Sequence, residues 1–476
     1  MKKITIIIPV LLLLLCAGCN KFLDVRPDEN TYEEEIFKTE NGFTKALNAV
    51  YKDLTESTLY GEELKYGLMD KLVGYWQLSG NDVNARAIDN YNYSVIGVEQ
   101  DINALWSGLY NAIHQTNLII KNLPTLENQA NYNIIAGEAY GLRAFLHLEV
   151  LKIFGPVIKQ EGLDKTAIPV YRTAGKEAQK FSTAKEALAF IEEDLQKALS
   201  LLKEDPIQVV GRAGSKEDSP LGEYYALFDR RGIRMNYYAV KALLARKSQW
   251  EGDNNKAYDR AMEVINELNE TKAVKFVDPY TFWESTPDLR FASEYIFAVY
   301  DNDAVTKYNR NFLSNDYVMQ FDNFLYPLYY NGTGDEYDIR INWGIDEYSD
   351  TFSKFKAVQS DVENQNYNVF EIQLIALPEM YFIAMESKLQ SNPTEALELL
   401  NEVRLRREMG ALELESPREI ANAFMDEIRR EYIGEGFLFS HYKRRFHEIY
   451  KIGKVVPPSL DIFKLPIPRN EQIYNR

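Results

Sequence analysis

Cysteines, histidines and carboxylates are the side chains of this 476-residue chain whose types could support covalent, metal or acid–base chemistry. The four histidines, His114, His147, His441 and His447, are never spaced four apart around the glutamate of a zinc-binding helix. The sequence also contains no Gly-x-Ser-x-Gly elbow and no phosphate-binding loop of the Walker type. Residues 301–305 (DNDAV) begin like a calcium loop but lack its later ligands. We therefore expect no catalytic residue, no metal and no cofactor.

A glycoside hydrolase is the one catalytic class that these patterns leave open, because it needs only two carboxylates about 5–10 Å apart. The chain has 71 aspartates and glutamates, so its composition neither supports nor excludes such a pair. The sequence lacks the alternation of strands and helices that predicts a barrel enzyme. A non-catalytic protein is the expectation.

Both cysteines, Cys16 and Cys19, stand at the end of an apolar run, residues 4–15, that follows two lysines. A helix needs about 20 apolar residues to cross a bilayer, so this shorter run is typical of a secretory signal peptide. The segment CAGC resembles a bacterial lipobox, although the position of Cys16 is usually leucine. We expect residues 1–18 to be removed and Cys19 to carry acyl chains. The alternative is an ordinary signal peptide that is cut nearby.

The net charge of −17 argues against nucleic acid and anionic membrane surfaces as partners, since both need basic patches. No later apolar stretch approaches the length of a membrane span, so lipid on Cys19 would be the only membrane attachment. Aromatic residues make up 13% of the chain, with 32 tyrosines among them. Tyrosine stacks on sugars and peptides but also builds ordinary cores, so this content does not select a ligand.

Apolar residues recur at steps of three and four along much of the chain, which predicts amphipathic helices. Several come as a helix, a short polar turn and a second helix with small residues near its start, the layout of a tetratricopeptide hairpin. A tether over residues 19–40 would lead into a single domain, residues 41–476. We expect a mainly α fold with four helical units, near residues 44–123, 134–202, 235–268 and 371–407.

Three segments without helical period, residues 60–104, 205–232 and 275–370, are rich in Gly, Asn, Asp and Tyr, and residues 294–300 (EYIFAVY) predict a strand. Long loops on a rigid frame usually carry function, so we expect the binding surface there. Sugar recognition combines an aromatic face with planar polar side chains. The candidate ligand contacts of this kind are Tyr75, Trp76, Asn81, Asp82, Arg86, Tyr330 and Trp343. The alternative for each aromatic residue is burial against loop backbone.

Seven blocks of sequence follow the lipobox in order. They are KFLDVRPDE (21–29), LWSGLYNAIHQTNLIIKNL (105–123), GEAYGLRAFLHLEVLKIFGPV (137–157), KALLAR (241–246), EALELLNEVRLRR (395–407), EIRREYIGEGF (427–437) and FKLPIPRNE (463–471). Together they resemble the SusD/RagB family of outer-membrane nutrient-binding lipoproteins over nearly the whole mature chain. No single block is decisive, and their shared order carries the resemblance.

The resemblance implies a SusD-like fold, in which four tetratricopeptide-like helix pairs support a loop-rich ligand-binding half. Family members are non-catalytic lids over a TonB-dependent, SusC-like β-barrel transporter, and they capture glycans and sometimes peptides. We therefore expect a lipid-anchored protein on the surface of the outer membrane that delivers oligosaccharide or polysaccharide to such a transporter. The alternatives are a peptide-binding member of the same family and a tetratricopeptide-type scaffold of the envelope.

One departure from the family follows Glu435 and Gly436, where the family usually has an arginine two residues on and an aspartate three further on. Here these positions are Leu438 and His441. Loss of both charges together is expected if they contact each other, since removing one partner of a buried pair costs about 3–5 kcal/mol. We expect Leu438 to be buried in a helix.

Overall fold

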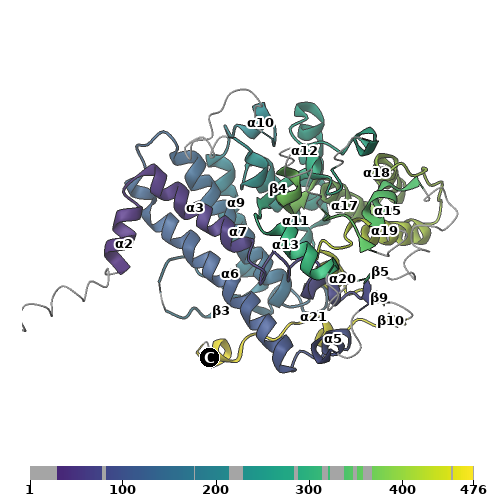
Figure 1. Ribbon diagram of the computed structural model, residues 1–476, viewed down its shortest axis with the longest axis horizontal. Coiled ribbons are helices and arrows are strands. Elements are labelled where there is room, and N and C mark those ends of the chain that lie inside the picture. The colour runs from purple at the N-terminus through teal and green to yellow at the C-terminus, as the bar shows by residue number, and fades with distance from the viewer. Residues whose placement is uncertain are drawn as a thin grey trace, which may run out of the picture.

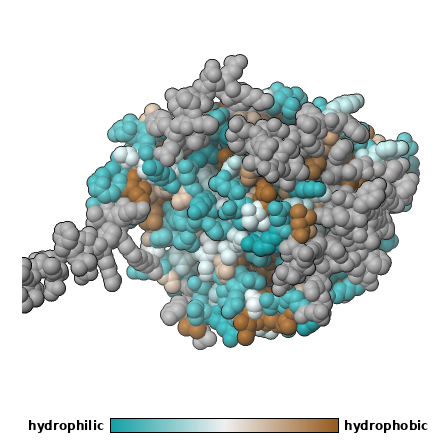
Figure 2. All heavy atoms as spheres, in the orientation of Figure 1, coloured by the Kyte–Doolittle hydropathy of each residue, from teal (hydrophilic) through white to brown (hydrophobic). Residues whose placement is uncertain are grey.

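The computed structural model shows a mainly helical protein with short strands (Figure 1). Within the part of the chain that the structure describes, no helix combines the length and the apolarity that a membrane span requires. The described surface in Figure 2 is mostly hydrophilic, with separate hydrophobic patches. The structure describes residues 29–77, 82–175, 177–213, 229–283, 288–313, 320–321, 337–346, 351–356, 367–451 and 454–474.

The longer helices are α2 (Glu29–Ile36), α3 (Glu40–Leu54), α6 (Ile96–Asn122), α7 (Tyr132–Phe154), α9 (Ala184–Leu201), α11 (Tyr237–Glu251), α12 (Asn254–Thr271), α17 (Leu377–Lys388), α18 (Pro393–Arg406), α19 (Pro417–Glu431) and α20 (Leu438–Arg445). The shorter ones are α4 (Leu68–Lys71), α5 (Val83–Asp89), α8 (Ile158–Glu161), α10 (Ile207–Val210), α13 (Ala304–Tyr308), α15 (Ile339–Gly344), α21 (Leu460–Phe463) and α22 (Arg469–Tyr474).

The strands form small antiparallel sheets. One has the order β1 (Trp76–Gln77), β5 (Gln320–Phe321), β7 (Thr351–Phe352) and β6 (Ile345–Asp346). The others pair β4 (Tyr295–Tyr300) with β8 (Glu371–Ala376), β2 (Thr166–Pro169) with β3 (Phe181–Thr183), and β9 (Ile449–Lys451) with β10 (Lys454–Val456).

Helix pairs build the frame, as the sequence predicted. Helix α3 packs on α6, α7 on α9, α11 on α12, and α17 on α18. The predicted apolar face of α12, from Ala257 to Leu268, is buried. Helix α9 begins at a capping box between Thr183 and Glu186, which satisfies two backbone N–H groups at its start. Helix α7 is buried on nearly all sides and ends at Gly155, so it forms the centre of the first half of the frame.

Two expected boundaries are corrected by the structure. The tether over residues 19–40 contains a helix, because α2 occupies Glu29–Ile36 and Lys121 and Asn122 both donate to its Glu33 (2.8 Å each). The helical unit expected over residues 371–407 begins instead with strand β8, whose residues are all buried. A segment as short as EIQLIA (371–376) does not by itself distinguish a buried strand from a helix, and pairing with the predicted strand β4 decides this case.

Buried ion pairs explain the most recognisable sequence block, residues 137–157. Glu138 of α7 is fully buried and contacts both Arg231 and Arg234. Arg143, one turn further on, donates to both carboxylate oxygens of Asp194 on α9 (2.7 and 2.8 Å). These residues join distant parts of the frame, so the block is structural.

Candidate functional site

Trp76 lies in β1 with only 2% of its surface exposed. Phe312 and Phe352 pack edge-on against it, with ring centroids 5.4 and 5.3 Å away, and the indole N–H donates to Asp70 Oδ2 (3.1 Å). The expectation that Trp76 presents a ring face to a ligand is therefore corrected. Neighbouring aromatic side chains cover the ring, and its packing gives it a structural role.

Asp70 connects β1 to the turn before α20. Its carboxylate accepts hydrogen bonds from the backbone N–H groups of Gly434 (2.8 Å) and Gly436 (3.2 Å) in addition to that of Trp76. Burial raises the pKa of Asp70 to about 7, although these hydrogen bonds act to lower it. Both glycines have positive φ, 75° and 74°, a conformation that favours glycine.

The remaining predicted contacts are spread over several elements. Tyr75 is fully buried. Asp82 caps α5 by accepting from the backbone N–H of Asn84 (2.8 Å), and Arg86 of the same helix is exposed. Trp343 belongs to α15, but its side chain, like Asn81 and Tyr330, lies outside the described residues. Their contact with a ligand stays a prediction.

A cleft of about 560 Å³ opens where the ends of α11 and α17 meet α8 and α20. This volume falls in the range of about 300–1,000 Å³ that is usual for small-molecule sites. Trp250, Ile158 and Leu389 form apolar parts of the lining. The polar lining combines planar amides with charged groups: Gln249, Asn254, Gln390, Lys159, Glu251, Glu386, Arg444 and Arg445.

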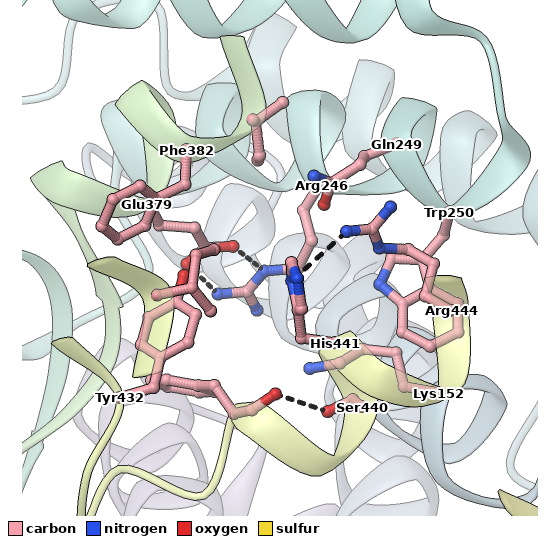
Figure 3. A pocket seen from close by; sticks show the side chains of 13 residues that line it. Lys152, Arg246, Gln249, Trp250, Glu379, Phe382, Tyr432, Ser440, His441 and Arg444 are labelled. Atoms are coloured by element: carbon pink, nitrogen blue, oxygen red, sulfur yellow. Dashed lines mark hydrogen bonds and ion pairs between the residues drawn. The ribbon is translucent and has the colours of Figure 1, made fainter. Parts of the chain in front are cut away.

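A narrower pocket of about 50 Å³ adjoins the cleft, since Gln249, Trp250 and Arg444 line both (Figure 3). At one side, Arg246 donates to both oxygens of Glu379 (2.6 and 2.7 Å). This pocket is too small for a sugar ring, because a cavity needs roughly 10–15 Å³ of such volume for a single water molecule. It has room for one small substituent.

Glu386 is the central charge of the cleft. It accepts from both terminal nitrogens of Arg444 (2.8 and 2.5 Å) and from Gln249 Nε2 (3.1 Å), and Arg445 Nε lies 3.9 Å away. Burial acts to raise the pKa of Glu386, but Arg444 and Arg445 outweigh it and hold this pKa well below its usual value. The carboxylate is therefore ionised at neutral pH.

His441 of α20 lines the narrower pocket beside the cleft and is 8% exposed. Burial lowers its pKa well below the usual value; Glu386 opposes this shift and both neighbouring arginines add to it. The imidazole is thus neutral, and its Nδ1 faces the guanidinium of Arg444 at 3.5 Å (Figure 3). Because a guanidinium can only donate, Nδ1 accepts and Nε2 carries the proton.

No pattern in the sequence predicts this cleft. Its residues come from helix ends that are far apart in the chain. The binding surface was predicted instead in the loops rich in Gly and Tyr. Trp250 is only 5% exposed although it lines the cleft. The basic run HYKRRFH (441–447) was the available signal.

The chain is similar in sequence to known proteins over part of its length. Residues 21–217 match the SusD-like family described as "Starch-binding associating with outer membrane". SusD-like protein P2 of Formosa agariphila is 28% identical over 159 residues, which cover 33% of this chain and 31% of that protein. The sequence match thus spans less than a third of that curated relative.

Solved structures match over a larger share of the chain. A SusD superfamily protein of Bacteroides thetaiotaomicron has a TM-score of 0.72 at 20% identity, covering 91% of this chain and 97% of that one. A SusD-like carbohydrate binding protein of Bacteroides vulgatus has a TM-score of 0.68 at 19% identity, covering 91% and 96%. The fold is therefore that of the SusD superfamily. The sequence similarity to the SusD-like family covers residues 21–217, and over the rest of the chain the likeness is one of fold.

Proposed function

We propose that this protein is a non-catalytic lipoprotein of the outer-membrane surface that binds oligosaccharide or polysaccharide and delivers it to a partner TonB-dependent β-barrel transporter. The observation that carries the proposal is the match of residues 21–217 to a family described as starch-binding and associated with the outer membrane. One solved neighbour of the whole chain is described as carbohydrate binding. The signal peptide and lipobox expected over residues 1–19 would direct the chain to that membrane.

The cleft has the chemistry that sugar binding needs. Its amides can both donate to and accept from hydroxyl groups, and Trp250 adds an apolar wall. Glu386 is held ionised by two arginines, so it has no proton to give as a general acid at neutral pH. Glu379 in the adjoining pocket is engaged by Arg246. Both carboxylates are thus arranged for contacts, which supports binding. Asp82, Arg86, Tyr330 and Trp343 are proposed as further contacts from the loop-rich half.

A glycan screen on residues 20–476 tests the proposal, with a peptide library screened in parallel. We expect at least one glycan to bind, and Gln249→Ala to weaken it about ten-fold through loss of a hydrogen-bonding amide. Gln196→Ala on the exposed face of α9 is the matched control and should bind normally. Binding of peptides with no glycan would replace this function by the peptide-binding alternative.

The anchor is tested separately. Cys19→Ala should abolish labelling by a palmitate analogue and leave the protein uncleaved or released from the outer membrane, because no other acylation site is expected. Fractionation of cells that express the full chain, with Cys16→Leu as the control that keeps the lipobox, measures both effects. Normal labelling of the Cys19→Ala variant would contradict the proposed anchor.

A further inference from the structure

Arg445, the last residue of α20, lines the cleft with 19% of its side chain exposed. Within the described residues its guanidinium makes no hydrogen bond; its one ion pair, to Glu386, spans 3.9 Å, and its Cζ lies 5.3 Å from the ring centroid of Phe424. Its Nη1 atom is buried without a hydrogen-bond partner. A guanidinium has five N–H donors, and leaving buried donors unpaired is costly. An acceptor brought by a ligand would remove that cost.

The carboxylate of Glu386 does not supply an acceptor for Arg445, because its oxygens already accept hydrogen bonds from other side chains. Both oxygens of Glu386 accept from Arg444 at 2.8 and 2.5 Å, and one also accepts from Gln249. One carboxylate therefore faces two guanidinium groups on the same helix. The charged residues that line the cleft are Lys159, Arg444 and Arg445 against Glu251 and Glu386, so the lining is net positive in a chain whose net charge is −17.

His441 provides a second, independent observation. Its Nε2 atom is buried and has no hydrogen-bond partner, and the residue lines the small pocket beside the cleft. Since Nδ1 faces a donor, Nε2 is itself a donor. His441 and Arg445, four positions apart on α20, thus each carry an unpaired donor.

We infer that the cleft between α11, α17 and α20 binds an anionic sugar residue, whose carboxylate or sulfate group is held by Arg445 with His441 in support. The planar fork of an arginine pairs two of its N–H groups with two oxygens of such a group, and the paired charges make these hydrogen bonds strong. The adjoining amides are placed to contact ring hydroxyls. This inference rests on the proposed function and specifies its ligand class.

Matched pairs of oligosaccharides test the inference by isothermal titration of residues 20–476. The probes are trigalacturonate against α-1,4-galactotriose, a β-1,4-linked triglucuronate against cellotriose, and a sulfated against an unsulfated agaro-oligosaccharide. We expect the anionic member of at least one pair to bind ten-fold or more tightly, with a preference that shrinks as salt rises. The uronate and sulfate pairs distinguish the two sources of negative charge.

Arg445→Met keeps the aliphatic stem and removes the fork, so it should abolish the preference for the anionic member of the pair. Arg445→Lys should retain part of the preference, and His441→Phe should reduce it. Arg172→Met, at an exposed ion pair with Glu193, is the control that keeps it. Equal affinity for both members of every pair, or a preference that survives in Arg445→Met, would overturn the inference. Tight binding of neutral glycans alone would overturn it and leave the proposed function standing.

Discussion

Arg231 in the helical frame and Arg445 at the cleft are both largely removed from solvent, but their surroundings are opposite. Arg231 is fully buried and donates to both oxygens of Asp205 (3.0 and 2.8 Å), to Glu138 and to the carbonyl of Met235 (2.9 Å). Arg445 has no hydrogen-bond acceptor among the described residues. A buried charge that the chain itself pairs serves stability, whereas an unmatched donor at a cleft favours a ligand that supplies the acceptor.

The largest expected effect is the loss of stability on substitution of Arg231, whose charge is paired within the chain. Arg231→Met should lower the free energy of unfolding by about 3–5 kcal/mol, because it leaves Asp205 as a buried carboxylate without its partner. Urea denaturation measures this loss. The exposed Arg172→Met should change stability little, since surface ion pairs contribute little. Similar stabilities for the two variants would contradict the structural role of the buried cluster.

A second large effect concerns Leu438, which begins α20 and is fully buried, as expected from the sequence. Leu438→Arg should destabilise the fold by about 3 kcal/mol, because it buries an unpaired charge. Adding His441→Asp, which restores the family pair, should recover much of this loss. A double variant that is no more stable than the single one would refute the pairing, and thermal unfolding of all three proteins decides the question.

The pH dependence of stability should distinguish the carboxylate of Glu386 from those of exposed acidic residues. The native pKa of Glu386 lies below its unfolded value of 4.5, so its contribution to stability is complete above about pH 4.5 and is lost as pH falls through the native pKa. Glu386→Gln should therefore lower stability at pH 7 and flatten the decline of the melting temperature below about pH 4.5. A control at Glu193, which is exposed, should leave the curve unchanged.

The smallest expected effect is at Trp76. Trp76→Phe removes the hydrogen bond to Asp70 while keeping an aromatic ring, so we expect a loss of about 1–2 kcal/mol in the free energy of unfolding. Glycan affinity should stay within two-fold of the wild-type value, because the ring is covered. A ten-fold weaker affinity in a stable variant would restore Trp76 as a ligand contact.

Local patterns in the sequence were enough to predict the helices and one strand. Repeated apolar steps predicted α7, α9, α11 and α12, because one face of a helix must be buried wherever it packs. A short apolar run rich in β-branched and aromatic residues predicted β4. The expected burial of Leu438 also came from sequence, through the joint loss of two charges, and the structure confirms it.

Only the tertiary structure decided which charges pair and which stay unmatched. Arg231 and Glu138 are 93 positions apart in the chain, and the cleft joins residues from α8, α11, α17 and α20. Trp76 is a second case. A loop sequence with aromatic and polar residues does not reveal whether the indole ring contacts a ligand or, as here, packs against Phe312 and Phe352. Periodicity reports which face of an element is buried, but contacts between distant segments determine what each side chain meets there.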